Sequence, residues 1–465
     1  MKPLNPGVGR RTFLKAAGIG VAALSAATDV IADSAAAAAR TPPAMRPGVR
    51  LNVRDFGATG DGATKDTLAF QQALDRCAML GGGEVLVPAG IYLIGAIVLG
   101  SDTLLRLHEQ ATLQGSPDLA DYPLTQVRWE GRFIKGHIGL VSALNADNIG
   151  IAGAGKILGN TAIQGRVDRV TGLRHPALLE FTRCKNVRVQ DCFTQQNDMW
   201  SIHPVFCQNV ILSNMTINGG ADGIDVDSCQ QVVIEHCAFD TADDCISLKS
   251  GRGEEGHALQ RPTEDVYIAH CRFRDHNWAC IGIGSETSGG IRRVHVEHCQ
   301  CLGAKTFAIY IKSRPGRGAY IEDIRMNDLD VSGAQGGFLR FNFLNSGKQD
   351  AFPVPGADGI PTVRNFHFNN IHVRDVPVLV DGTDIHPDKP LEGFSLTNVT
   401  GTCGKGIALA NITRAVLGNI AVTGFSGPLL SMHNVRGTGL DGAVALAAPT
   451  LPEPVPPPAV PYLLR

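Results

Sequence analysis

The sequence predicts an all-β protein that folds as a right-handed, single-stranded parallel β-helix. Two observations predict it. A short apolar pattern of the form N/D-V-x-I/V-x-x-C/L recurs along the chain, and a sustained 3.6-residue apolar period is missing. Short β-branched segments separated by turn residues favour strands stacked as a solenoid over a sandwich or a helical array.

The repeat is defined by an apolar reference residue that further apolar residues follow two and five positions later. The reference positions are Val187, Val210, Val232, Val266, Val294, Ile324, Phe366, Phe394 and, more weakly, Ala415. Their spacings are 23, 22, 34, 28, 30, 42, 28 and 21 residues. Equivalent positions on successive coils should therefore lie about 4.8 Å apart, the spacing of hydrogen-bonded strands.

Three carboxylates fall at related positions of this repeat. Asp222 and Asp244 each lie 12 residues after a reference position, so we expect them to stack, with Asp243 beside them. The same count places Trp278 in their column. Asp and Gly also serve simply as turn residues between strands. Clustered carboxylates are, however, the groups that glycoside hydrolysis requires, because like charges raise one pKa and let an acid and a base coexist.

Length and charge narrow the possible classes of protein. A solenoid grows in one dimension, so a single domain over residues 40–448 is consistent with a chain of 465 residues. The formal net charge of −2 gives no reason to expect nucleic acid as a partner. A polyanionic substrate would need a local basic cluster.

Residues 1–39 have the features of an export signal. RRTFLK at 10–15 precedes an Ala-rich apolar run at 16–27, which is typical of a twin-arginine signal, and small residues at 32–39 offer cleavage sites. An uncleaved membrane anchor is the alternative, although the run is short and followed by Asp29 and Asp33. We expect a periplasmic or extracellular protein without stable membrane insertion after cleavage. The proline-rich tail at 449–465 should be extended along the body or disordered.

Twelve cysteines in an exported protein would ordinarily predict disulfides. Their register predicts ladders of free thiols inside the coil instead. Three lie three residues before a reference position and four lie five residues after one; they are Cys184, Cys207 and Cys229, and Cys192, Cys237, Cys271 and Cys299. Tight Cys/His spacings are missing, so we expect neither metal nor cofactor. Surface or turn positions are expected for His236, His270 and His298.

Several motifs together resemble glycoside hydrolase family 28, the polygalacturonase-like pectin hydrolases with the pectin lyase-like fold, over roughly residues 50–435. They are TADDCISLKSG at 241–251, IGSETSGGI at 283–291, YIKSRPGRG at 310–318 and the segment that begins VRDFGATGDG at residue 53. The last resembles the N-terminal cap of the family. It implies a short helix that closes the end of the β-helix.

The resemblance also implies roles for the site residues. Asp243 would be the general acid, while Asp222 and Asp244 would position and deprotonate a water on the opposite face of the sugar. Direct attack by that water would invert the anomeric centre. Lys312 matches the lysine of the RIK motif of the family and would hold a uronate carboxylate, if it is not simply a surface charge. Arginines of fixed geometry could add an anion-binding rim or be merely structural; the candidates are Arg314, Arg317, Arg292 and Arg293.

The chain departs from the family at two helper positions. The histidine of the family falls at Trp278 or Ala279, with His276 as a substitute if the turn bulges, and the arginine of RIK is Tyr310. A more aromatic site suits stacking on sugar faces, so we expect Trp278 and Tyr310 to bind substrate. This favours rhamnogalacturonan, xylogalacturonan or short exo-type substrates over plain endo-polygalacturonase action.

The expected function is therefore that of an exported, monomeric, inverting hydrolase that cleaves galacturonate-containing bonds of pectic polysaccharides or oligosaccharides. A rhamnogalacturonan or xylogalacturonan hydrolase of the same family is one alternative. A pectate lyase would share the β-helix but would need calcium or a basic side chain. A non-catalytic pectin-binding β-helix would not need three carboxylates.

Overall fold

The computed structural model describes residues 48–274, 277–456 and 462. The proposed export signal at 1–39 and His276 lie outside these residues. Among the described helices, none is long and apolar enough to cross a membrane.

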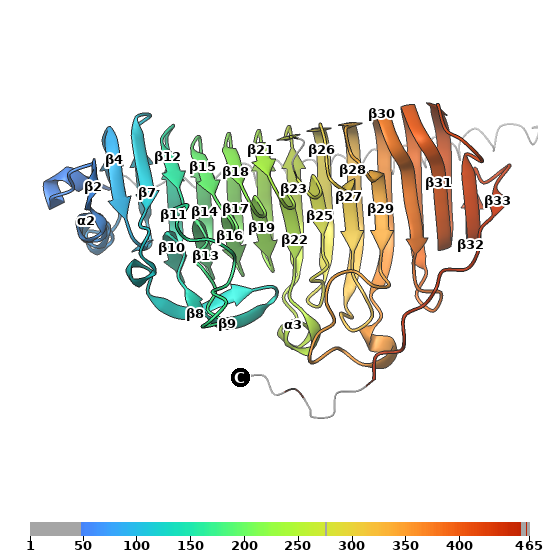
Figure 1. Cartoon of the computed structure of the whole chain (residues 1–465), viewed down its shortest axis with the longest axis horizontal. Coiled ribbons are helices and arrows are strands. Elements are labelled where there is room, and N and C mark those ends of the chain that lie inside the picture. The colour runs from blue at the N-terminus through green and yellow to red at the C-terminus, as the bar shows by residue number, and fades with distance from the viewer. Residues whose placement is uncertain (1–47, 275–276, 457–461, 463–465) are drawn as a thin grey trace, which may run out of the picture. The chain divides into compact units, whose positions relative to one another are not determined.

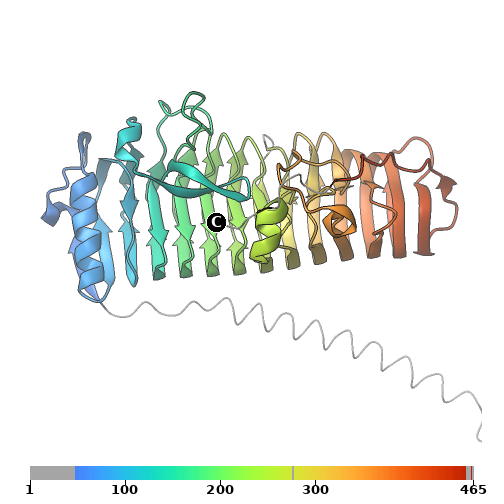
Figure 2. The same ribbon diagram turned by 90° about the horizontal axis from the view of Figure 1, so that it is seen from below.

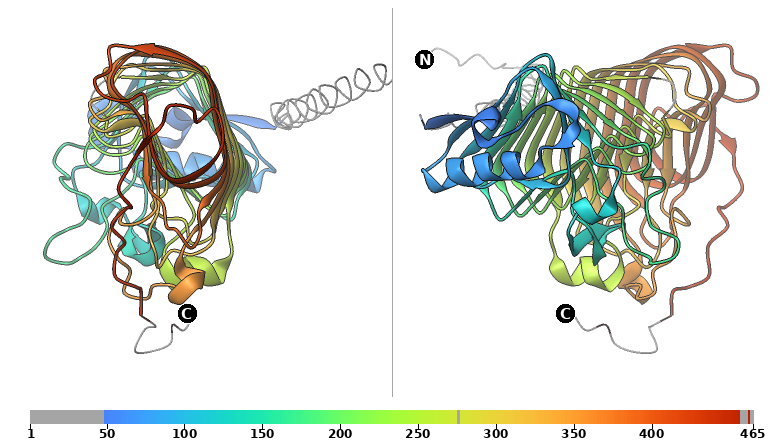
Figure 3. Two further views of the ribbon diagram at one scale, coloured as in Figure 1. Left: turned by 90° about the vertical axis from the view of Figure 1, so that its right-hand side faces the viewer. Right: turned by 60° about the vertical axis from the view of Figure 1, so that its left-hand side comes forward.

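The chain from Val49 onwards winds into a right-handed parallel β-helix, which confirms the predicted fold class (Figure 1). Each coil contributes strands to three parallel ladders. Viewed end-on, the successive coils superimpose around one closed interior (Figure 3). Later in the chain single long strands bend from one ladder into the next; β26, for example, pairs with both β23 and β24.

The strands divide among the ladders as follows. The first ladder contains β1 (Val49–Asn52), β3 (Gly83–Val87), β6 (Thr103–Leu107), β11 (Asp147–Ala152), β14 (Lys185–Gln190), β17 (Gln208–Ser213), β20 (Gln230–Glu235), β23 (Thr263–Ala269), β26 (Ile291–Cys301), β28 (Tyr320–Ser332), β30 (Thr362–Asp384), β31 (Leu391–Thr423) and β32 (Leu430–Thr438), which β33 (Val444–Ala445) follows. The second contains β2 (Asp61–Lys65), β4 (Gly90–Ile94), β7 (Ala111–Gly115), β12 (Lys156–Leu158), β15 (Phe193–Gln196), β18 (Thr216–Gly219), β21 (Ala238–Thr241) and β24 (Arg272–Phe273). The third contains β5 (Ile97–Val98), β10 (Val141–Leu144), β13 (Leu179–Thr182), β16 (Ile202–Val205), β19 (Ile224–Asp227), β22 (Ile246–Lys249), β25 (Ile281–Ile283), β27 (Phe307–Lys312) and β29 (Gly337–Asn342).

Helices and one antiparallel hairpin lie outside the three ladders of this solenoid. The capping helix is α2 (Thr67–Met79), which buries Phe70, Leu74 and Cys77 against the first coil. The antiparallel hairpin of β8 (Leu124–Trp129) and β9 (Arg132–His137) lies outside the strands near α3 (Gly253–Leu259), as Figure 2 shows. Three short 3-10 helices complete the set: η1 (Val53–Phe56), η2 (Leu119–Asp121) and η3 (Gly356–Gly359).

The sequence repeat is the hydrogen-bonding register of the first ladder. Val187 pairs with Val210, Val210 with Val232, and Val232 with Val266. The pairing continues through the next reference positions, Val294, Ile324, Phe366 and Phe394. The apolar pattern therefore reports which residues are neighbours across coils.

The turns before and after the first ladder use left-handed backbone. Asn186 and Asn209 have φ of 55° and 57°, a region that Asn tolerates better than most residues. Each amide donates at 2.7 Å to the Asn of the preceding coil, so the turn is stabilised by a ladder of side-chain hydrogen bonds. After the strand, the rings of His236, His270 and His298 stack on the surface at 4.8 and 5.2 Å, as the repeat predicted.

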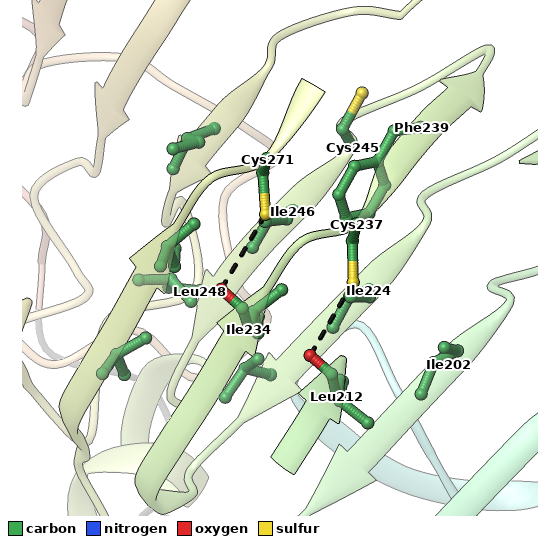
Figure 4. Packing of buried hydrophobic residues seen from close by; sticks show 14 of the residues in the cluster. Ile202, Leu212, Ile224, Ile234, Cys237, Phe239, Cys245, Ile246, Leu248 and Cys271 are labelled. Atoms are coloured by element: carbon green, nitrogen blue, oxygen red, sulfur yellow. Dashed lines mark hydrogen bonds between the residues drawn. The ribbon is translucent and has the colours of Figure 1, made fainter. Parts of the chain in front are cut away.

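All twelve cysteines are free and buried, which confirms the predicted thiol ladders. Cys237 and Cys271 lie one above the other, and their thiols approach the carbonyl oxygens of Leu212 and Ile234 at 3.7 and 3.8 Å (Figure 4). Burial raises the pKa of the Cys192 thiol to about 12. Such thiols pack as small apolar groups and stay protonated.

Because every thiol is buried, we expect native protein to react with few or none of its thiols in a colorimetric titration. Denaturation without reductant should expose all twelve. A count that stays the same before and after denaturation would show that the cysteines are paired.

Candidate active site

The candidate site lies on the outer face of the third ladder. Alternate residues of these strands point inward as isoleucine and leucine, and the others point outward. One outward row contains Asp225, Ser247, Gly282 and Tyr310, which pair across successive strands. The neighbouring outward row contains Asp227, Lys249 and Lys312.

Asp222 and Asp244 are stacked on successive coils, as the 22-residue step predicted. Ile224 pairs with Ile246, and each carboxylate stands two residues before its isoleucine. The hydroxyl of Ser247 lies 3.3 Å from Asp222 Oδ2 and 3.1 Å from Asp244 Oδ2, so the two carboxylates converge. Both side chains are buried.

Trp278 does not continue this column, and that prediction was wrong. Ile246 pairs with Ile281, and Cys245 donates its backbone N–H to Ala279 at 3.0 Å, so Ala279 occupies the position beside Asp244. Trp278 instead donates its backbone N–H to the carbonyl of Asp243 at 3.1 Å. The coil between β23 and β25 contains one more residue than its predecessor, which shifts the register.

Each carboxylate has its own cation. The pairs are Asp222 with Lys249 at 3.0 Å, Asp244 with Lys312 at 2.8 Å, and Asp243 with Arg166 at 2.5 Å. The lysines come from the repeat itself, while Arg166 comes from the loop between β12 and β13. The sequence analysis identified Lys312 but missed Lys249 and Arg166.

Lys312 reaches Asp244 because the coil between them carries glycine. The strand β25 places Gly282 between Ser247 and Tyr310 on the outer face. A Cβ at Gly282 would meet Asp244 Oδ2 at 2.3 Å and Lys312 Nζ at 3.4 Å. The missing side chain therefore opens the path of the ion pair.

The environment gives the two stacked carboxylates opposite pKa shifts. Burial alone would raise the pKa of Asp222, but Lys249 and Arg166 outweigh it, and the net pKa lies below the ordinary value. At Asp244, burial is the largest effect and raises the pKa. The charge of Lys312 lowers this pKa, whereas repulsion from Asp222 and Asp243 raises it further, and the net pKa lies above the ordinary value. Asp222 is therefore the member of the pair that stays ionised to the lower pH, which suits it to act as a base.

A buried network lies beneath Asp222. Lys249 pairs with both Asp222 and Asp225, and its ammonium lies 4.5 Å from the centre of the Trp200 ring. Burial together with the charge of Asp222 raises the pKa of Asp225 well above its usual range. Lys249 therefore stabilises the negative charge of this carboxylate cluster through its ion pairs.

These groups line an open pocket of about 490 Å³, within the range of small-molecule sites. Its walls include Trp278 and Tyr310, as predicted from the sequence, together with Arg166 and Glu130 of the hairpin turn. Trp278 is 46% exposed, so its indole is available to a ligand. Among the described residues, no group of three or more His, Cys, Asp or Glu side chains could hold a metal ion.

The predicted arginine rim is mostly structural. Arg314 does not line the pocket; its guanidinium donates to the carbonyl of Gly347 at 2.6 Å. Arg317 reaches the pocket wall, but it is 1% exposed and forms an ion pair with Asp350. Arg292 and Arg293 pair with Glu264 on the first ladder.

Comparison with known proteins identifies the family. Residues 77–339, more than half of the chain, match the model of the glycosyl hydrolases family 28. The chain belongs to this family. It is thus a polygalacturonase-like glycoside hydrolase, as the motifs implied.

Family 28 members of similar sequence come from plants and bacteria. A probable polygalacturonase of Vitis vinifera is 29% identical over 362 residues, covering 74% of this chain and 73% of that protein. An exo-poly-alpha-D-galacturonosidase of Dickeya chrysanthemi is 27% identical over 413 residues, covering 75% of this chain but 65% of that protein, slightly less than two thirds. A hyperthermoactive exopolygalacturonase from Thermotoga maritima superposes with a TM-score of 0.73 and 26% identity, covering 83% of this chain and 94% of that one.

The Lys249 network predicts an altered pH profile. Replacing Lys249 by Met should raise the pKa of Asp222, because the strongest charge that lowers it is removed. Activity that needs ionised Asp222 should then be lost at a higher pH on acidification. We expect the variant to lose roughly tenfold more activity, relative to wild type, at the acidic end of the profile than near neutrality. The reason is that an opposite charge at this distance typically shifts a pKa by a unit or more.

Lys249→Arg, which keeps the charge, is the matched control, and thermal melting of both variants reports folding. A uniform loss at every pH, in protein that melts normally, would contradict the assigned role of Lys249.

The exposure of Trp278 predicts a role in binding. Trp278→Ala should weaken binding of a pectic oligosaccharide by about 1–3 kcal/mol, comparable to losing one aromatic contact surface. The melting temperature should change little because the indole is not buried. Parallel calorimetry and melting would test this, and the opposite result, lower stability with unchanged affinity, would assign the side chain to packing.

Proposed function

We propose that this protein is an exo-acting, inverting hydrolase that removes galacturonate-containing units from the ends of pectic chains. The arrangement of the three carboxylates carries the proposal: Asp222 and Asp244 converge on one point of the pocket, and Asp243 stands next to them. In this arrangement Asp243 protonates the glycosidic oxygen, and Asp222 with Asp244 activates a water on the other face.

The buried carboxylates support a single displacement by water. The pKa of Asp222 is the lowered one of the pair, and Asp244 Oδ1 is buried without a hydrogen-bond partner among the described residues. Such an oxygen can accept a hydrogen from a water that Asp222 deprotonates. A water placed between them would invert the anomeric centre, and no covalent intermediate would be needed.

The pocket supports action at a chain end because the hairpin closes one side. Trp200 occupies the position one coil before Asp222, and Trp129 of the hairpin stacks on it at 4.9 Å. The hairpin is fixed by Arg128, which is buried and pairs with Asp227 at 2.9 Å and with Glu255 at 3.0 Å. We infer that a bound sugar chain ends at the wall that Trp200 and the hairpin residue Glu130 form.

The residues that line the pocket also support a class of substrate, and the N-terminal sequence supports a location for the protein. The pocket suits a uronate sugar: Lys312 and Arg166 can bind its carboxylate, and the aromatic walls can stack on the face of its ring. Similar proteins are named for action on polygalacturonate. Export through the twin-arginine route, proposed from residues 10–27, would bring the enzyme to its polymer. A rhamnogalacturonan or xylogalacturonan hydrolase is the second candidate, favoured by Tyr310 in place of the arginine.

Product analysis on a panel of defined pectic oligosaccharides tests this proposal. We expect galacturonate-containing end units from the first minutes, with inverted anomeric configuration by NMR. Asp243→Asn should lower turnover by roughly 10²–10⁴-fold with an unchanged melting temperature, because the proton donor is lost. Near-full activity of Asp243→Asn, unsaturated products or random internal cleavage would each contradict the assignment.

A further inference from the structure

The cation on Asp243 comes from outside the repeat. Arg166 lies in the loop that joins β12 to β13, and the backbone around it is fixed on both sides. Gly165 donates its N–H to Asp198 at 2.6 Å, and its carbonyl lies 2.9 Å from a ring nitrogen of His175. The N–H of His175 donates to the carbonyl of Arg166 at 3.0 Å. The loop therefore delivers the guanidinium to a defined place above the carboxylates.

Arg166 binds one of the two carboxylate oxygens of the proposed general acid, Asp243. Its Nη2 donates to Asp243 Oδ2, while Asp243 Oδ1 accepts the backbone N–H of Asp244 at 3.1 Å. Both oxygens of Asp243 are thus engaged. A glycosidic oxygen that approaches Oδ2 must therefore compete with the guanidinium for that oxygen.

Arg166 is also the most accessible of the three cations that pair with Asp222, Asp243 and Asp244. Its side chain is 37% exposed, whereas that of Lys312 is 14% exposed and held between Asp244 and the ring of Tyr310. Tyr310 itself brings no charge. The planar, multi-donor guanidinium of Arg166 is therefore open to an incoming carboxylate, which such a group can bind bidentately.

We propose that Arg166 determines specificity by binding the carboxylate of the uronate substrate and, in doing so, releasing Asp243. This inference rests on the proposed function. The guanidinium exchanges one carboxylate for another, and the exchange makes or breaks no covalent bond. Asp243 Oδ2 then takes up a proton from solvent, passes it to the leaving glycosidic oxygen, and the base accepts a proton from the attacking water.

Binding of the substrate carboxylate by Arg166 is then a requirement for turnover, because it releases Asp243. A neutral or esterified sugar gives Arg166 no alternative partner, so Asp243 stays engaged even when the pocket is filled. Discrimination should therefore appear in kcat as well as in KM. A residue that only stabilises the loop would affect both kinds of substrate equally.

The test combines two enzymes with two substrates. Wild type and Arg166→Gln are assayed on a galacturonate oligosaccharide as the free acid and as its methyl ester. We expect wild type to prefer the free acid, and Arg166→Gln to lose about 10- to 100-fold of that preference, the range for a hydrogen bond to a charged group. Arg169→Gln removes an exposed arginine of the same loop and should keep the wild-type preference.

An equal loss on acid and ester would overturn the proposal and make Arg166 structural. Unchanged preference in Arg166→Gln would overturn it as well. Arg166→Gln could have a lowered melting temperature. In that case Arg166→Lys should fold and retain an intermediate preference, because lysine keeps the charge but lacks the planar guanidinium. Wild-type protein that cleaves neither substrate would instead overturn the proposed function, a result distinct from a failure of Arg166.

Discussion

Carboxylates stacked on successive coils repel one another, and the site depends on the cations placed between them. Asp222 and Asp244 approach closely enough to share the hydroxyl of Ser247. In a buried setting such repulsion is strong, because the effective dielectric is far lower than that of water. Lys249 and Lys312 come from the same outward row, each pairs with a different carboxylate, and Asp222 and Asp244 are left with different pKa shifts. The stacking that creates the repulsion therefore also gives the two water-activating carboxylates different affinities for a proton.

The narrow interior of the solenoid explains why the site can be held so firmly. Inward columns of isoleucine and small free cysteines let consecutive coils pack at strand spacing without gaps. The outward rows inherit that spacing, so a lysine two coils from Asp244 can reach it across Gly282. Substitution of a buried residue that displaced one coil would alter the distance between charges as well as the stability of the fold.

The sequence allowed the fold and the stacked acids to be predicted because both depend on the repeat. Val187 through Phe394 set the register, and the 22-residue step from Asp222 to Asp244 follows from it. Trp278 was misplaced because one extra residue in its coil shifts the count after Val266. Lys249 carries a sequence signal that was available, since it stands in the same outward row as Lys312. Arg166 carries none, because a loop of irregular length brings it to Asp243.

The division between repeat and loops has a chemical consequence. The lysines belong to strands of the third ladder, and the carboxylates belong to the turns that lead into β19 and β22, whose backbone is hydrogen-bonded to neighbouring coils. Arg166, Glu130 and Trp129 belong to segments that leave the solenoid and return. Arg166 and Glu130 line the pocket, and Trp129 stacks on Trp200, which also lines it. These segments can change in length or sequence without disturbing the ladder, so substrate choice can change while the acids stay in place. The uncharged Tyr310 at the position of the family's arginine fits this view, because Arg166 supplies a cation to the same pocket from a loop.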